Sequence, residues 1–490
     1  MEKFDTSTSF SVKDESSASS AESHSRSFDL IVLGGGAGAF AAAITANEKG
    51  AKTALINAGL PLGGTCVNVG CVPSKTLLKI GEIAYYGNHG FDAISGKLEV
   101  DFEKAIKHEL GLVDKMRHDK YTEVLSNLEN VTHIEGKAKF VSKNEVAVGD
   151  KKLYGKKFVI ATGSTAAPLP LEGIEKVDYI THIDALKLKK QPKSMVIIGA
   201  GPVGLEFGQM YHHFGTKVTI LQRSKAIMPR TEPELSKAMQ GYLEEEGIKI
   251  ITSASSKRVR KENGEIVVTF EVNGKNQEAK GEILMFAAGK KPNTKDLGLE
   301  KTGVKVNEKG AIVVNDEMKT NAAHIWSVGD VTDKPLRLET TAGKEGKIAA
   351  ENALDGKKKT MDYSAVPYAV FTTPSLAGVG QTDEQVVKSG IKCACNTLSF
   401  ELVPKAAIIN DTRGLIKIVA DNETHKVQGI HILGPEAADL IHEATMIVKN
   451  KMTLEEVIDT THVFPTLSES IKLAAQNFFR DVSKLSCCVE

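Results

Sequence analysis

Two cysteines five residues apart carry the clearest chemical signal in the sequence. Cys66 and Cys71 lie between a glycine-rich turn and a helix expected to begin near Ser74. Residues at this spacing point about 140° apart on a regular helix, so only a distorted first turn brings the sulfurs within disulfide reach. Because a helix N-terminus also favours a thiolate, the spacing indicates a redox-active pair rather than two packed core cysteines. Structural zinc is not expected, because it needs four Cys or His ligands and no second pair stands at a suitable spacing.

Four further cysteines occur late in the chain. Cys393 and Cys395 alternate along a predicted strand, and simple packing is favoured over metal binding for them. Cys487 and Cys488 are adjacent within residues 485–490, a segment expected to be a mobile tail because chain ends fray. Two neighbouring accessible thiols indicate an arm that captures a soft metal ion or exchanges disulfides.

Length and composition limit the class of protein. The 490 residues suffice for about two to four domains, and 41% of them are hydrophobic. Lys plus Arg and Asp plus Glu both number 62, so no net charge attracts nucleic acid or a membrane surface, and no apolar run is long enough to span a bilayer. Residues 1–27 are rich in serine and are expected to form a disordered arm without the features of a signal or transit peptide. These observations predict a cytoplasmic protein whose cysteines serve redox or metal chemistry.

The first folded segment carries a nucleotide-binding fingerprint. A strand is expected at residues 28–33, followed by a glycine turn and an alanine-rich helix. In this arrangement the backbone approaches a pyrophosphate at the helix N-terminus. The next strand ends at Asn57, where an acid usually binds a ribose hydroxyl and where the amide can still form a hydrogen bond. The other cofactor contacts expected in this unit are Gly34, Gly36, Ala37 and Gly38.

A second copy of the fingerprint follows a strand at residues 195–198. Its next strand ends at Gln222, in the place that Asn57 holds in the first unit, and Arg223 comes directly after it. A neutral residue followed by a cation favours the 2′-phosphate of NADPH over NADH, unless the cations here only form a solvated surface. The glycines expected to contact this cofactor are Gly199, Gly201 and Gly204.

The sequence predicts an α/β fold with two Rossmann-like nucleotide-binding domains and a C-terminal α+β domain. Small-residue turns after buried strands, at residues 161–164 and 286–294, add Thr162, Gly163 and Gly289 as cofactor contacts. Another strand ends at Asp330, which is placed to bind a ribityl hydroxyl or, alternatively, to cap a turn. After residue 362 alternating strand segments and two helices indicate the separate C-terminal domain.

Two nucleotide units joined to a redox dithiol resemble the flavoprotein disulfide reductases, also called class I pyridine nucleotide-disulfide oxidoreductases. The resemblance extends from residue 28 onward and is carried by residues 63–75, 161–163, 199–204 and 329–330. It implies FAD bound by residues 28–168 and 287–362, NADPH bound by residues 169–286, and a homodimer formed through residues 363–484.

The same resemblance implies the roles of individual residues. Cys71 is expected to lie against the flavin as the charge-transfer thiolate, and Cys66 is expected to be the interchange thiol. Lys75 is expected near flavin N5 and paired with Glu206. Further FAD contacts are expected at Gly64, Thr65, Lys75 and Ala138.

One position departs from the pattern of members that reduce dithiols. Those members carry a histidine directly before a proline near the C-terminus, as the base that moves a proton to the leaving thiol. Here that position is Phe464, which carries no proton, while His462 lies two residues earlier. Glu469, which orients the histidine in those members, is expected to lack its partner.

The missing base and the terminal cysteines together resemble the mercuric reductase group of this family. Hg(II) is a soft ion that prefers thiolates, and its reduction to Hg(0) needs no general acid. The resemblance implies that Cys487 and Cys488 of one subunit pass Hg(II) to Cys66 and Cys71 of the other, so that active sites are shared in the homodimer. Two features differ from that group: the serine-rich arm stands where an N-terminal metal-binding domain is common, and Thr466 stands where tyrosine is frequent.

Two alternatives remain. A disulfide reductase like thioredoxin reductase or lipoamide dehydrogenase fits the fold, but Phe464 argues against it because that chemistry needs the histidine. A non-catalytic flavoprotein that only sequesters metal is disfavoured by the intact second fingerprint, since sequestration needs no NADPH.

Overall fold

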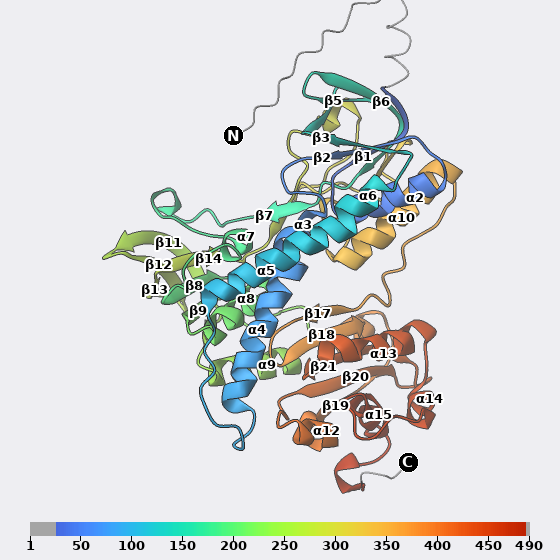
Figure 1. The fold of residues 1–490 in the computed structure, drawn as a ribbon. Coiled ribbons are helices and arrows are strands. Elements are labelled where there is room, and N and C mark those ends of the chain that lie inside the picture. The colour runs from blue at the N-terminus through green and yellow to red at the C-terminus, as the bar shows by residue number, and fades with distance from the viewer. Residues whose placement is uncertain (1–25, 487–490) are drawn as a thin grey trace, which may run out of the picture.

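The computed structural model describes residues 26–486, which form three lobes around a long central helix (Figure 1). The first lobe holds the sheet at the top of the view, the second holds the sheets at its left, and the third holds the sheet at its lower right. Among these residues no helix combines the length and the apolar character needed to cross a bilayer. The arrangement confirms the predicted α/β class, with two Rossmann-like units and a C-terminal α+β domain.

The first lobe is built on a sheet whose central strand, β1, is buried on both faces. Helices α2 (Ala37–Glu48) and α10 (Glu339–Asp355) lie side by side on one face, and residues 297–314 pack on the other. This burial explains the nearly continuous apolar run of β1, as expected for a parallel strand. From edge to edge the strands are β3 (Val131–Glu135), β2 (Thr53–Asn57), β1 (Ser27–Leu33), β6 (Lys151–Ile160), β5 (Glu145–Val148) and β4 (Ala138–Phe140), with β16 (Ile325–Ser327) also paired to β6.

The second lobe repeats the same parallel unit. Its β8 lies between two parallel neighbours, and the glycine turn after β8 leads into α8 (Pro202–His213). Helix α9 (Pro233–Glu245) connects β9 to β10, and a β7–β15 pair joins this lobe to the first. The strands are β10 (Lys249–Ile251), β9 (Lys217–Leu221), β8 (Ser194–Ile198) and β14 (Ile283–Phe286), the antiparallel β11 (Ser255–Glu262), β12 (Glu265–Val272) and β13 (Lys275–Gly281), and the pair β7 (Ser164–Ala166) and β15 (Lys290–Pro292).

The third lobe is an antiparallel sheet covered by helices, in agreement with the predicted α+β domain. Its edge strand β19 carries both Cys393 and Cys395. In strand order the sheet contains β17 (Tyr368–Val370), β18 (Ser375–Gly380), β21 (Val427–Gly434), β20 (Leu415–Asp421) and β19 (Cys393–Ser399). The helices of this lobe are α11 (Asp383–Lys388), α12 (Pro404–Ile408), α13 (Ala437–Asn450), α14 (Leu454–Asp459) and α15 (Glu469–Gln476).

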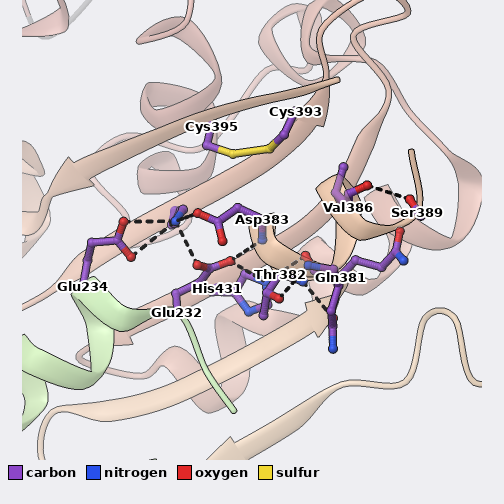
Figure 2. The surroundings of a disulfide bond; sticks show 12 residues. Glu232, Glu234, Gln381, Thr382, Asp383, Val386, Ser389, Cys393, Cys395 and His431 are labelled. Atoms are coloured by element: carbon purple, nitrogen blue, oxygen red, sulfur yellow. Dashed lines mark hydrogen bonds and ion pairs between the residues drawn. A yellow bond between two sulfur atoms is a disulfide. The ribbon is translucent and has the colours of Figure 1, made fainter. Parts of the chain in front are cut away.

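Cys393 and Cys395 form a disulfide along the edge strand (Figure 2). The sequence favoured simple packing of two thiols, and that prediction was wrong. Alternation does place both side chains on one face of β19, as expected. Cys395 is exposed and Cys393 is half-buried, so the sulfurs on this face meet each other instead of a packed core.

The central helix is α4 (Cys71–His89), which connects all three lobes. It follows the short helix α3 (Gly64–Val69) and packs beside α8 and α5 (Phe102–Arg117). Near its end the Tyr86 hydroxyl donates to Asp411 Oδ2 of the third lobe at 2.7 Å. The segment after α5 continues as a π-helical turn (His118–Thr122) and then as α6 (Glu123–Ser126).

Candidate active site

A break between two helices brings Cys66 and Cys71 together. Cys66 belongs to α3 and Cys71 begins α4, with Gly70 between the helices at φ −133° and ψ −110°. A Cβ atom on Gly70 would lie 2.9 Å from the carbonyl oxygen of Thr65, so only glycine fits without a shift. The helix therefore begins at Cys71 rather than near Ser74, and the predicted distortion is this break. Both cysteines are free thiols in the structure.

The two thiols differ in their electrostatic surroundings. A hydrogen bond from Cys66 lowers the pKa of Cys71, and the nearby Lys75 ammonium lowers it further. The same hydrogen bond, together with burial and the charge of Glu339, raises the pKa of Cys66. Cys71 is therefore the group that becomes a thiolate first, while Cys66 keeps its proton to higher pH.

An ion pair beneath the cysteines joins the three lobes. Lys75 Nζ of α4 lies 2.7 Å from Glu206 Oε2 of α8, and Glu206 is almost fully buried. The other oxygen, Glu206 Oε1, accepts the backbone N–H of Phe371 at 3.0 Å, next to β17. Lys75 Nζ also lies 4.6 Å from the centre of the Phe371 ring. The sequence named Lys75 and Glu206 but gave no indication of Phe371.

A cavity connects the cysteines to the N-terminus of α2. Its walls include the predicted contacts Gly36, Ala37, Gly38, Thr65, Lys75, Gly163 and Asp330, together with Val203, Glu206 and Lys290 of the second lobe. At the α2 end the backbones approach closely, since a Cβ on Gly64 would lie 2.6 Å from Gly36 Cα. Asp330 is held in the wall by the Ser164 hydroxyl, which donates to its carboxylate at 2.7 Å. Bare backbone at a helix N-terminus fits the pyrophosphate of a dinucleotide.

The amide side chains at the two strand ends brace the glycine turns. Asn57 donates to the Leu60 carbonyl oxygen at 3.0 Å, and its Oδ1 lies 2.3 Å from where a Cβ on Gly35 would stand. Gln222 Oε1 accepts the N–H of Ala200 at 3.0 Å. Each amide therefore supports the turn of its own unit, and Arg223 is exposed just beyond Gln222.

The remaining predicted contacts lie outside the walls of this cavity. Ala138 begins β4, and Thr162 accepts at its backbone oxygen from Asn293 at 2.9 Å. Residues of the second glycine turn stand at the N-terminus of α8. The predicted residues that do not line the cavity are Gly34, Asn57, Gly64, Ala138, Thr162, Gly199, Gly201, Gly204, Gln222, Arg223 and Gly289.

The segment before Pro465 presents apolar surface in place of an imidazole. Phe464 is 48% exposed, on the third lobe. The His462 ring lies 2.7 Å from Glu443 Oε1 and 2.8 Å from the Thr460 carbonyl oxygen, so it belongs to that lobe's own contacts. Glu469, expected to lack its histidine partner, accepts the backbone N–H of Thr466 at 3.2 Å.

A carboxylate that the sequence did not predict lies beside the two thiols. One oxygen of Glu339, the first residue of α10, lies with the sulfurs of Cys66 and Cys71 so that all three atoms are within 4.8 Å of one another. Burial raises the pKa of Glu339. In the sequence an acid at a helix start indicates only a favourable interaction with the helix dipole, so no local pattern marked this residue. The other predicted metal ligands, Cys487 and Cys488, lie outside the described residues.

A dithiol facing a cavity at the N-terminus of one Rossmann helix, with a second Rossmann unit across that cavity, defines a flavin-linked disulfide oxidoreductase. The chain belongs to the pyridine nucleotide-disulphide oxidoreductases: the family model matches residues 28–346, and the model of the family's dimerisation domain matches residues 366–475. This membership confirms FAD and a pyridine nucleotide as cofactors, and the dimerisation domain supports a homodimer.

Relatives from several organisms narrow the comparison. The chain is 40% identical over 466 residues to the mercuric reductase of Lysinibacillus sphaericus, covering 94% of this chain and 84% of that one. It is 38% identical to the mercuric reductase of Streptomyces lividans, covering 94% and 98%. It is 34% identical to dihydrolipoyl dehydrogenase 1, mitochondrial, of Arabidopsis thaliana, covering 93% and 91%.

A solved structure shares the fold. The Cu(II) complex of the HOCl-induced flavoprotein disulfide reductase RclA from Escherichia coli superimposes with a TM-score of 0.83 at 29% identity. The match covers 92% of this chain and 99% of that chain.

Proposed function

We propose that this protein is an NADPH-dependent mercury(II) reductase, which reduces Hg(II) to Hg(0) through FAD and the pair Cys66 and Cys71. The observation that carries the proposal is the side chain before Pro465. Phe464 cannot shuttle the proton that a dithiol or disulfide substrate needs, whereas two thiolates alone suit a soft cation. The 38–40% identity to several mercuric reductases supports the same assignment.

The chemistry needs little proton transfer at the substrate. Hg(II) displaces one proton from Cys66, the thiol with the raised pKa, and binds Cys71 as an existing thiolate. Bound FAD supplies the electron pair that originates on NADPH. When two electrons reach the metal, Hg(0) leaves two thiolates, and Cys66 then takes a proton back from solvent. In the net reaction NADPH and Hg(II) therefore give NADP⁺, one proton and Hg(0). No leaving sulfur has to be protonated, which is consistent with Phe464.

The chain's own residues place these participants. Residues 28–168 and 287–362 hold FAD, with its pyrophosphate at the N-terminus of α2 and Asp330 toward its ribityl chain. Residues 169–286 hold NADPH. Lys75 and Glu206 fix the spacing between the two nucleotide units, because their ion pair at 2.7 Å joins α4 to α8. Residues 363–484 form the homodimer, and a reduced dithiol with an NADPH supply suits a cytoplasmic protein.

Sharing of active sites between subunits is the finer part of the proposal. Cys487 and Cys488 of one protomer deliver Hg(II) to the inner pair of its partner by thiolate exchange, so the ion keeps two sulfur ligands throughout. The double variant Cys487→Ala, Cys488→Ala should lower turnover most when Hg(II) arrives bound to bulky thiols. Wild-type rates in that variant would remove the terminal pair from the mechanism.

The preference for NADPH is tested at the end of β9. Gln222→Glu keeps an oxygen that can accept the Ala200 N–H, but places a negative charge where a 2′-phosphate would lie. The ratio of kcat/KM for NADPH to that for NADH should fall, while flavin content stays unchanged. An unaltered ratio would contradict this assignment.

One assay separates the proposed function from its alternative. NADPH oxidation is measured with Hg(II) in excess small thiol, and in parallel with oxidised glutathione, thioredoxin and lipoamide. Turnover with Hg(II), accompanied by volatile Hg(0), is expected. Turnover with a disulfide alone would make the protein a disulfide reductase.

A further inference from the structure

The cysteine pair is accompanied by a third side chain able to hold a metal ion. Within residues 26–486, Cys66, Cys71 and Glu339 form the one group of three or more Cys, His, Asp or Glu side chains spaced closely enough to share an ion. Metal–sulfur bonds are about 2.3 Å and metal–oxygen bonds about 2.1 Å. Three ligand atoms within 4.8 Å of one another are near the separations that one shared ion requires, and rotation of the side chains brings them onto it.

Glu339 is held in place by its surroundings. It begins α10, whose first turn is closed by the Thr341 hydroxyl donating to the Leu338 carbonyl oxygen at 2.8 Å. The Tyr121 hydroxyl donates to Glu339 Oε1 at 3.3 Å. Tyr121 is itself fixed edge-on against Phe40, with ring centres 4.9 Å apart. The carboxylate thus faces the thiols because the fold holds it there.

We propose that Glu339 is a third ligand of the cation bound by Cys66 and Cys71, which makes this a site of two sulfurs and one oxygen. The proposal deepens the proposed function, because it rests on the two thiols being the metal-binding groups. It also names a wider ligand class: divalent thiophilic cations that accept more than two donors. Binding of such a cation to the reduced pair releases one proton from each thiol that carries one.

The oxygen ligand affects different cations to different degrees. Hg(II) is satisfied by two thiolates, so an added carboxylate contributes little to its binding. Cd(II) and Zn(II) take three or four ligands and gain more from an oxygen donor.

The test compares Cd(II) with Hg(II) on the NADPH-reduced, FAD-loaded enzyme. Cd(II) alone is titrated and followed by its thiolate charge-transfer absorption, and X-ray absorption counts the oxygen neighbours of the bound metal. Glu339→Gln should weaken Cd(II) binding by about ten- to a hundredfold and remove the oxygen neighbour. Its affinity for Hg(II) should change much less. Tyr121→Phe, which frees the carboxylate, should give an intermediate loss for Cd(II).

A matched control lies on the same helix. Glu351→Gln makes the same substitution at a residue whose carboxylate pairs with Lys359 at 2.6 Å, so it should leave Cd(II) affinity unchanged. Equal flavin content and equal melting temperature establish that each variant is folded. Cd(II) affinity unchanged in Glu339→Gln, or only sulfur neighbours in the wild type, would overturn the proposal.

Failure of this inference is distinguishable from failure of the proposed function. If Hg(II) is reduced but Cd(II) affinity is the same in Glu339→Gln as in the wild type, only the assignment of Glu339 as third ligand is wrong. If Hg(II) is not turned over but Cd(II) binding depends on Glu339, the three-ligand metal site is supported and the assignment as a mercury(II) reductase is wrong.

Discussion

The protein contains two cysteine pairs whose chemistry is set by their surroundings. Cys66 and Cys71 come from two helices, remain free thiols, and face a cavity between nucleotide-binding lobes. Cys393 and Cys395 come from one edge strand and are joined to each other. The inner pair is polarised, because the hydrogen bond between the two thiols lowers the pKa of Cys71 and raises the pKa of Cys66.

The edge pair has a different electrostatic setting. Figure 2 shows the charged side chains Glu232, Glu234 and Asp383 near the disulfide. The buried Lys417 lies 2.8 Å from Glu232 and 2.7 Å from Asp383. These charged groups form ion pairs with one another and not with a sulfur, and the ion pairs join the second lobe to the third. The comparison teaches that the two inner sulfurs differ in pKa because they come from different helices and one donates to the other, whereas the two sulfurs of one strand are simply bonded to each other.

The largest expected effect comes from the inner pair. Cys71→Ser should lower kcat for Hg(II) by about a thousandfold or more, because a serine hydroxyl neither ionises at neutral pH nor binds a soft cation. Flavin content should remain normal, since the cavity walls are otherwise intact. Steady-state NADPH oxidation with Hg(II) measures the effect. Retention of more than a tenth of wild-type turnover would show that the inner pair does not hold the metal.

A smaller effect is expected from the cation beside Cys71. Lys75→Met removes the charge that helps to lower the pKa of Cys71 and leaves the buried Glu206 without its partner. Turnover should fall by about tenfold, and the long-wavelength charge-transfer band of the reduced enzyme should weaken at neutral pH. The matched variant Lys79→Met lies one turn along α4, where Lys79 pairs with Glu82 at 2.6 Å, and should preserve the band. An unchanged band in Lys75→Met would mean that the helix N-terminus and the hydrogen bond from Cys66 are enough to keep Cys71 a thiolate.

The polarisation of the inner pair also predicts a pH dependence. The pKa of Cys71 is lowered from 9.0, so between its folded value and 9.0 the folded state gains stability as pH rises. Cys66, whose pKa is raised, keeps its proton in both states over that window and contributes nothing there. Cys71→Ser should therefore lower the melting temperature more near pH 8 than near pH 5. Equal losses at both values would show that Cys71 is not a thiolate in the reduced protein.

Local sequence patterns made the cysteine pair and the nucleotide units predictable. The parts of the site that depend on contacts between distant segments could not be predicted. The glycine turns and the spacing of Cys66 and Cys71 are fixed by backbone geometry, which acts over a few residues, so the nucleotide units and the pair could be recognised. Glu339 could not, because it reaches the thiols only when α10 packs against α2. Helix α4 begins three residues earlier than predicted, directly after the break at Gly70. A side chain at Gly70 would clash with the backbone of α3.

The state of the edge pair, Cys393 and Cys395, could not be predicted from the local sequence either. Two cysteines at alternate positions of a strand share a face whether they pack, bind a metal or form a disulfide. The outcome depends on how far elements from elsewhere in the chain bury that face, which leaves Cys393 half-buried and Cys395 exposed here.

The smallest effect is expected from the edge pair. The double variant Cys393→Ser, Cys395→Ser removes a cross-link that closes a very short loop, so it should cost about 1–2 kcal/mol of unfolding free energy without reductant. In dithiothreitol the wild type and the variant should melt together, because the disulfide is then open in both. Turnover with Hg(II) should stay at the wild-type level, since the pair lies on the third lobe and does not line the nucleotide cavity. If turnover instead fell as far as in Cys71→Ser, both pairs would belong to one electron path and the contrast between them would be lost.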